Sequence, residues 1–346
     1  MATNTGAFLT AANHPLVVQS APYPTPGPNE VVIKAQAVAL NPCDWAMLML
    51  GPDFFKGLKL PCVIGEDVAG EVTAVGPGVT TFKPGSRVAG LATAAFQTHV
   101  LLKSHLTIPI PASLPYTQAA VMPLALSTAV KALFHKDYLH LTLPSTTPPP
   151  PRTNQTVLIW GASTSVGSNA IQLAVAAGYE VITTASPSNF PLALQLGAAR
   201  VFDYNSPTVT ADLIDAFRGK TTPGALCNSG PAPTSHPAVI AACAAVIAAP
   251  TTIIADGSAR FLALTMATPA AEYLPEGVEG KFVEPLEGDE ELAAAVFGGY
   301  MPAALVEGRF VPAPMAQVVG HGLGALQSGI DMLKAGVSAR KLIVTL

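Results

Sequence analysis

The residues with the clearest chemical potential form a short loop of small side chains between an apolar run and a helical pattern. The segment from Trp160 to Gly167 reads Trp-Gly-Ala-Ser-Thr-Ser-Val-Gly and directly follows the apolar run Thr156–Trp160. When a buried strand is followed by a tight loop and then by the first turn of a helix, backbone N–H groups and the helix dipole point at a bound pyrophosphate. The predicted nucleotide-binding residues are Gly161, Ser163, Thr164, Ser165, Val166 and Gly167.

This loop departs from the GxGxxG pattern, because Ser and Thr occupy the positions between its two glycines. Small hydroxylated residues still let the backbone approach a ligand, and their side chains can donate to phosphate oxygens. The alternative is an ordinary strand-to-helix turn in which Ser and Thr only cap the helix.

The choice between NAD and NADP depends on the end of the second strand, about 20 residues after the loop. The segment 183–189, Thr-Thr-Ala-Ser-Pro-Ser-Asn, contains no carboxylate to bind a ribose 2′-hydroxyl or to repel a 2′-phosphate. The hydroxyl and amide groups of Ser186 and Asn189 could bind that phosphate, so the sequence favours NADPH. Tyr204, after the third strand, could add a phenolic donor or be an edge tyrosine without a ligand.

Composition excludes several other classes of protein. The chain has 346 residues, a net charge of -4 and no basic run, so it lacks the electrostatic pattern that holds nucleic acids. Its most apolar stretch, Ala238–Ala249, is too short to span a membrane, and the N-terminus lacks a signal peptide's basic and apolar regions. We therefore expect a cytoplasmic protein.

The residue types that bind metals are scattered along the chain. Cys43, Cys62, Cys227 and Cys243 lie far apart, and the seven histidines show no ligand spacing. Neither a zinc site nor a disulfide framework is predicted, and the cysteines are expected to be reduced.

The loop requires elements that position it, and the patterns divide the chain into two parts. Glu30–Leu40 and Gly65–Val75 predict strands of a partly antiparallel sheet, and the sequence from Tyr116 to His135 predicts helix. A proline-rich stretch, 144–152, then predicts an exposed connector.

After the connector, strand and helix patterns alternate, which predicts a doubly wound parallel sheet. The predicted strands and helices are Thr156–Trp160, Ser165–Ala177, Glu180–Thr184, a helix ending near Gly197, Arg200–Tyr204, the helix Ala238–Ala249, Thr251–Ala255, Gly324–Gly336 and Lys341–Leu346.

Motifs across nearly the whole chain resemble the zinc-independent medium-chain dehydrogenases/reductases of the quinone reductase type, and most closely the fungal trans-acting enoyl reductases that partner polyketide synthases. The motifs that carry the resemblance are Asn41-Pro-Cys-Asp-Trp45, Gly65-Glu-Asp-Val-Ala-Gly-Glu-Val72, Pro84-Gly-Ser-Arg-Val88, Pro123-Leu-Ala-Leu-Ser-Thr-Ala129, the Gly161–Gly167 loop, and Leu196-Gly-Ala198 before Val201-Phe-Asp-Tyr204.

The resemblance implies an α/β protein with a GroES-like, mainly β catalytic domain at 1–127, completed by 295–346, and a Rossmann domain at 128–294. It implies NADPH-dependent reduction of a C=C bond conjugated to a carbonyl or thioester, in a cleft between the domains. It places Thr128 beside the nicotinamide and Asn41 toward the cleft, with Asp44 as a further candidate. The implied partners are an unsaturated substrate, free or tethered to a carrier protein, and a polyketide synthase, with the protein as a monomer.

Two departures from the family pattern leave other functions open. Relatives carry Lys after the Trp of the first motif, where this chain has Ala46, and Cys227 stands where an acidic residue is expected. One alternative is a non-redox enzyme that directs cyclisation, addition or elimination on an unsaturated intermediate. Another is a protein that binds NADPH, or docks on a synthase, without catalysing a reaction.

Overall fold

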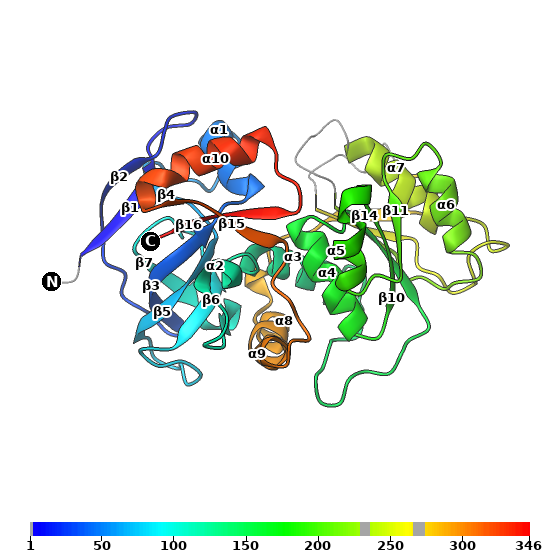
Figure 1. Ribbon diagram of the computed structural model, residues 1–346, viewed down its shortest axis with the longest axis horizontal. Coiled ribbons are helices and arrows are strands. Elements are labelled where there is room, and N and C mark those ends of the chain that lie inside the picture. The colour runs from blue at the N-terminus through cyan, green and yellow to red at the C-terminus, as the bar shows by residue number, and fades with distance from the viewer. Residues whose placement is uncertain (1–2, 229–235, 266–273) are drawn as a thin grey trace. The chain divides into compact units, whose positions relative to one another are not determined.

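A computed structural model describes residues 3–228, 236–265 and 274–346. The chain divides into two compact units, the first comprising Met1–Leu124 and Phe297–Leu346 and the second Ala125–Val296 (Figure 1). Each unit has its own sheet.

The first unit is mainly β-structure. Its elements are β1 (Asn4–Leu9), β2 (Val17–Ala21), β3 (Glu30–Ala39), α1 (Pro42–Phe54), β4 (Cys62–Val63), β5 (Asp67–Val75), β6 (Arg87–Leu91), β7 (His99–Lys103), η1 (Ser104–Leu106), β8 (Thr107–Pro109), α2 (Tyr116–Ala119), α9 (Met301–Val306), β15 (Met315–His321), η7 (Leu323–Ala325), α10 (Leu326–Ala335) and β16 (Arg340–Thr345). The larger sheet has the order β15-β16-β3-β5-β6-β8, with β7 also paired to β3, and the smaller has the order β2-β1-β4.

Strand β3 organises this unit, because it pairs with strands from both ends of the chain. Ala39, its last residue, lies opposite Asp67 of β5 and Ile343 of β16, and both pairings are antiparallel. Apolar side chains on both faces of β3, including Val31, Val32 and Ile33, are completely buried. The register therefore brings the start of α1 together with the first residues of β5 and β16.

The second unit has a parallel sheet of the order β11-β10-β9-β12-β13-β14. Its elements are α3 (Pro123–Phe134), which begins at the unit boundary, β9 (Thr156–Trp160), α4 (Ser165–Ala176), β10 (Glu180–Ala185), η2 (Pro187–Asn189), α5 (Phe190–Gln195), β11 (Arg200–Asp203), α6 (Val209–Ala216), β12 (Ala225–Cys227), α7 (His236–Ile247), β13 (Phe261–Leu264), β14 (Glu279–Phe282), η5 (Leu286–Gly288), α8 (Glu290–Ala293) and the π-helix η6 (Ala294–Tyr300), which crosses the boundary.

Helices cover both faces of this parallel sheet. Figure 1 shows α4 and α5 on one side of it and α6 and α7 on the other. Side chains of α6 and α7 pack with Leu158, Trp160 and Ile182 in one apolar core. From β9 the strand order runs outward through β10 and β11 on one side, and through β12, β13 and β14 on the other. The point between β9 and β12 is therefore a topological switch point, where doubly wound sheets bind their ligands.

The fold class predicted from the sequence is confirmed, and most predicted elements are present within a few residues of their expected bounds. The proline-rich segment 144–152 has neither helix nor strand and is mostly exposed. The predicted helix over 116–135 is divided into α2 and α3, with Pro123 at the start of the second.

The strand predicted at Thr251–Ala255 is wrong, because these residues form a turn and the strand lies later, at β13. The N–H groups of Ile253 and Ile254 both donate to the carbonyl oxygen of Pro250, so the backbone curls. Ile254 is nevertheless 2% exposed in the core. A short apolar run carries no periodicity that distinguishes a buried turn from a strand.

One helical stretch of the described residues, Tyr116–Phe134, is long and apolar enough by composition alone to cross a membrane. However, 78% of its most apolar 18-residue segment is buried inside the protein, and core helices can be equally long and apolar.

Candidate functional site

The Gly161–Gly167 loop lies at the switch point and is shaped by two glycines that no other residue can replace without strain. Gly161 has a φ of 88°, and a Cβ there would lie 2.4 Å from the carbonyl oxygen of Asn228. A Cβ on Gly167 would lie 2.1 Å from the carbonyl oxygen of Gly161. Both glycines therefore allow the backbone to close tightly over the end of β9.

Thr164 caps α4 with its side chain. Its hydroxyl donates to the carbonyl oxygen of Gly161 at 2.8 Å and accepts from the N–H of Gly167 at 3.0 Å and from the amide of Asn228. One donated and two accepted hydrogen bonds use the full capacity of a hydroxyl group. The Thr164 side chain is thus occupied in shaping the loop and has no hydrogen left to donate to a phosphate.

Backbone donors remain available in the same loop. The N–H groups of Ser163, Ser165 and Val166 have no hydrogen-bond acceptor within the part of the chain that the structure describes, and all three residues are half-buried. The N–H groups of Gly161 and Ala162 are bonded to Thr184. Unpaired N–H groups at the start of a helix form a ready anion site, so the arrangement suits a pyrophosphate.

The predicted 2′-phosphate residues lie at the same edge of the sheet. Ser186 and Asn189 follow β10, and the Asn189 amide donates to the Ser186 hydroxyl at 3.0 Å. Tyr204 follows β11, and the Tyr204 side chain is exposed. The last residue of β11, Asp203, lies opposite Ala185 of β10. The Asp203 carboxylate accepts from the N–H of Asn205 at 2.9 Å.

Asn41, predicted as catalytic, belongs to a buried polar centre of the first unit. Its amide nitrogen donates to Asp67 Oδ2 at 2.9 Å, and its amide oxygen accepts from Lys341. Lys341 Nζ lies 2.8 Å from Asp67 Oδ2, and Asp67 Oδ1 accepts from the N–H of Leu124 at 2.7 Å. Asn41, Asp67 and Lys341 are each at most 4% exposed, so these groups are satisfied by one another.

Asp44 lies at the start of α1, next to this centre. Its Oδ2 accepts from the backbone N–H of Asn41 at 2.7 Å, whereas its Oδ1 is buried without a partner among the described residues. Burial raises the pKa of the Asp44 carboxyl, and the Glu66 charge adds to this effect. Burial also raises the pKa of the neighbouring Cys43 thiol.

Thr128, the third predicted catalytic residue, lies on α3. It is half-buried, whereas its neighbours Ser127 and Ala129 are buried. One turn further on, Lys131 forms an ion pair with Asp289, and His135 Nε2 lies 3.3 Å from the same carboxylate. These contacts fix α3 against the start of α8.

Sequence reasoning missed Lys341 and Asn228. Lys341 begins an apolar strand pattern, and nothing in its neighbourhood along the chain indicates that its partner is 300 residues away. Asn228 directly follows Cys227 at the end of β12. Only its place after a parallel strand, next to the predicted switch point, could have drawn attention to it.

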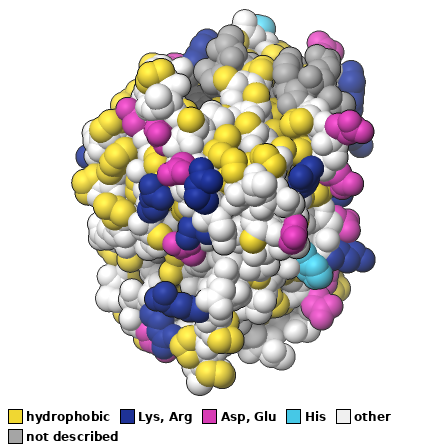
Figure 2. Space-filling view, turned by 90° about the vertical axis from the view of Figure 1, so that its right-hand side faces the viewer, with side chains coloured by type: hydrophobic (Ala, Val, Ile, Leu, Met, Phe, Trp, Pro, Cys, Tyr) yellow, Lys and Arg dark blue, Asp and Glu magenta, His cyan; other side chains and the backbone are white. Residues whose placement is uncertain are grey.

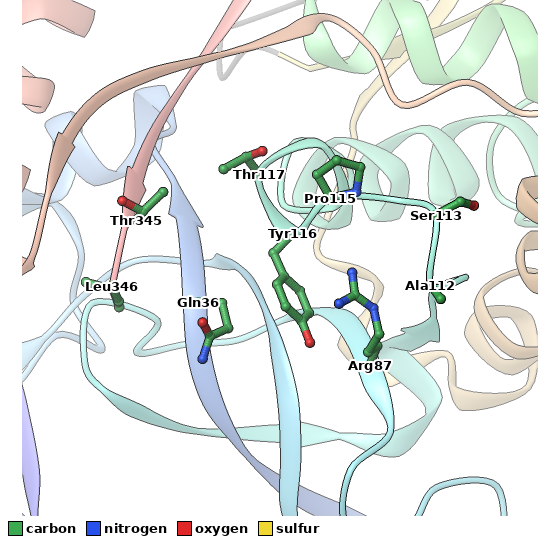
Figure 3. Close-up of a pocket in the computed structure, with 9 residues that line it drawn as sticks. All are labelled: Gln36, Arg87, Ala112, Ser113, Pro115, Tyr116, Thr117, Thr345 and Leu346. Atoms are coloured by element: carbon green, nitrogen blue, oxygen red, sulfur yellow. The ribbon is translucent and has the colours of Figure 1, made fainter.

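The structure also contains a groove of about 510 Å³ in the first unit, which none of the predicted site residues lines. Its lining residues are Gln36, Arg87, Ala112, Ser113, Pro115, Tyr116, Thr117, Thr345 and Leu346. Figure 3 shows the Arg87 guanidinium beside the Tyr116 ring, 4.0 Å from its centroid. Arg87 also donates to the carbonyl oxygen of Leu114 at 2.6 Å, so it serves to hold the 112–117 segment.

Charge on the surface is sparse and mixed. On the face shown in Figure 2, the described Lys and Arg side chains stand among acidic and apolar ones and form no continuous basic stripe. Within residues 3–228, 236–265 and 274–346 there is no group of three or more His, Cys, Asp or Glu that could hold a metal ion. Cys43, Cys62, Cys227 and Cys243 are not joined in disulfides.

Comparison with known proteins agrees with this architecture. Residues 27–112 match the alcohol dehydrogenase GroES-like domain. The chain is 49% identical to the dehydrogenase azaJ of Aspergillus niger, covering 100% of both chains. It is 38% identical to the trans-enoyl reductase himH of Aspergillus japonicus, covering 91% of this chain and 89% of that protein.

Solved structures share the fold at lower identity. The CurK enoyl reductase superposes with a TM-score of 0.74 at 20% identity, covering 99% of each chain. The mycobacterial Rv1454c complexed with NADPH gives a TM-score of 0.67 at 23% identity, covering 99% of this chain and 100% of that one. These structures show the fold, and the sequence relatives show that the chain belongs to the medium-chain dehydrogenase/reductase family and is an oxidoreductase.

Proposed function

We propose that the protein reduces a C=C bond conjugated to a carbonyl or thioester, with NADPH as the reductant. The observation that carries this proposal is the loop at the switch point, where the N–H groups of Ser163, Ser165 and Val166 are left without an acceptor among the described residues. The names of relatives such as the trans-enoyl reductase himH support the choice of an alkene as substrate.

The residues of the second unit fit the coenzyme. The three N–H groups would hold the pyrophosphate, and the paired Ser186 and Asn189 side chains with Tyr204 would hold the 2′-phosphate. The absence of a carboxylate in 183–189 favours NADPH over NADH. When bound, NADPH would supply a hydride to the β-carbon of the substrate, and a proton at the α-carbon would complete the reduction.

Thr128 is the residue we propose to face the nicotinamide, since it is half-buried between the buried residues Ser127 and Ala129. Asn41 and Asp44 would contribute by fixing the start of α1, because their side chains bond within the first unit's polar centre. In this proposal the GroES-like unit supplies substrate contacts and the Rossmann unit holds the coenzyme.

The substrate class and partner follow the same relatives. We infer an apolar, polyketide-type unsaturated intermediate, free or carried by a synthase, which suits a chain with 12% charged residues. We also propose that the protein is a cytoplasmic monomer. Light scattering of the purified protein would test the monomeric state.

The first test is a titration with NADPH and NADH, followed by fluorescence of the reduced nicotinamide. We expect NADPH to bind in the micromolar range and NADH more weakly. Absence of binding up to about 1 mM, roughly 4 kcal/mol weaker than a micromolar site, would overturn the proposal.

A second test concerns Ala46, the half-buried α1 residue that replaces the lysine of relatives. The variant Ala46→Lys would place an ammonium where it can stabilise an enolate, so we expect a higher kcat/KM for an enoyl thioester. Ala46→Met is the matched control, because it adds comparable length without charge. Equal rates in both variants would show that this position does not limit the reaction.

A further inference from the structure

Asn228 joins three strand ends at the switch point of the parallel sheet. It follows β12 directly, its carbonyl oxygen packs against Gly161 after β9, and its side chain contacts Thr265 after β13. It is 6% exposed, so its side chain lies within the protein.

Both ends of the Asn228 amide are committed. The nitrogen donates to the Thr164 hydroxyl, and the oxygen accepts from the Thr265 hydroxyl at 2.8 Å. The first of these bonds completes the set around Thr164, whose hydroxyl also contacts Gly161 and Gly167. The orientation of the loop's cap is therefore set by a residue more than 60 positions later in the chain.

We propose that Asn228 is a positioning residue for coenzyme binding. The Asn228 amide donates to one lone pair of the Thr164 hydroxyl oxygen. The hydroxyl hydrogen therefore points to the carbonyl oxygen of Gly161, and the other lone pair accepts from the N–H of Gly167. This holds the N–H groups of Ser163, Ser165 and Val166 in a fixed array around the pyrophosphate. The inference rests on the proposed function, because it assumes that this loop binds NADPH.

The effect of Asn228 on binding should depend on whether the ligand has a pyrophosphate. NADPH and 2′-phospho-ADP-ribose contain one, whereas 2′-AMP carries only the adenosine and the 2′-phosphate. A residue that merely stabilises the unit would affect all three ligands alike. A residue that positions the loop would affect the first two and spare the third.

The experiment compares wild type with Asn228→Ala, using NADPH fluorescence for direct binding and displacement of NADPH for the other two ligands. We expect Kd for NADPH and for 2′-phospho-ADP-ribose to rise about 3- to 10-fold, the range for one lost hydrogen bond, with Kd for 2′-AMP unchanged. An unchanged Kd for NADPH, or an equal rise for 2′-AMP, would overturn the inference. Failure of the wild type to bind NADPH would instead overturn the proposed function, and the inference with it.

Two further variants isolate the contact. Asn228→Asp retains an oxygen for Thr265 but replaces the donor to Thr164 with a charged acceptor near the phosphates, so we expect more than a tenfold loss of NADPH affinity. It also serves as the test if Asn228→Ala does not fold. Thr265→Val is the matched control. It removes the hydrogen bond to the Asn228 oxygen, and a longer one of 3.4 Å to the Cys227 carbonyl oxygen, but leaves the bond from Asn228 to Thr164 in place, so we expect a change in Kd below twofold.

A double-variant comparison shows whether Asn228 acts through Thr164. We expect Thr164→Val/Asn228→Ala to bind NADPH no more weakly than Thr164→Val alone, because both changes remove one shared contact. Independent losses that multiply would contradict the proposed route.

Discussion

Each unit contains a buried or half-buried polar centre, and the two centres differ in whether their hydrogen-bonding groups are all paired. Around Asn41, Asp67 and Lys341, side chains from three elements satisfy each other in the core of the first unit. Around Gly161–Gly167, side chains satisfy each other only enough to shape the loop, and backbone donors remain available. The groups of the first centre are therefore used up in holding the fold, whereas the second keeps the backbone donors that we propose bind the coenzyme.

This difference follows from which atoms do the work. A buried charge needs a specific opposite charge, so the first centre depends on particular side chains. An anion site at a helix start depends on backbone N–H groups, so almost any small side chains suffice if the backbone can close. Removing a charged side chain should therefore destabilise the first centre, whereas adding a side-chain atom to a loop glycine should distort the second.

The largest effect is expected from Lys341→Met, which leaves the Asp67 carboxylate buried without its counter-charge. We expect the free energy of unfolding to fall by about 3–5 kcal/mol, measured by urea denaturation. Asp67→Asn/Lys341→Met removes both charges and should recover most of the loss. A double variant as unstable as the single one would show that the ion pair is not the source of the effect.

Gly161→Ala should mainly affect the ligand site. The added Cβ would approach the Asn228 carbonyl oxygen to 2.4 Å at a φ of 88°, so the loop must shift. Strain of about 1–3 kcal/mol corresponds to roughly a 5- to 150-fold rise in Kd for NADPH, measured by fluorescence titration. Gly288→Ala, where a Cβ meets open space, is the control, and equal weakening there would contradict this explanation.

Asp44→Asn should change how the free energy of unfolding depends on pH, because the wild-type carboxyl is buried. Since burial raises the pKa of Asp44 in the folded protein, its favourable contribution is present at low pH and is lost as pH rises above the unfolded value of about 3.9. The stability of wild type relative to Asp44→Asn should therefore fall above about pH 4, by at most ~1.4 kcal/mol per pH unit. Urea denaturation at several pH values measures this, and a constant difference would contradict it.

The smallest effect is expected from Ser186→Glu, which introduces a carboxylate beside Asn189 at the end of β10. Repulsion of the 2′-phosphate should shift the ratio of NADPH to NADH affinity about fivefold toward NADH, roughly 1 kcal/mol. Ser186→Ala tests loss of the hydroxyl without added charge. If the two variants shift the ratio equally, the charge at this position is not what selects the coenzyme.

Local patterns along the chain were sufficient to predict most of the fold. Strand β9, the loop and α4 follow one another without a break, so their positions relative to each other are encoded locally. The main error, Thr251–Ala255, arose where an apolar run packs into the core as a turn. Periodicity cannot detect such a case, because the turn's shape depends on hydrogen bonds to Pro250.

The site shows the same division between local and tertiary information. The sequence by itself determined the loop, its two glycines and the absence of a carboxylate within the segment 183–189, because these features depend on neighbouring residues. Only the tertiary structure decided that Asn228 completes the hydrogen bonds of the Thr164 hydroxyl, and that Lys341 satisfies Asn41 and Asp67. Hydrogen bonds between residues far apart in the chain exist only once strand register has brought them together, so no local pattern contains them.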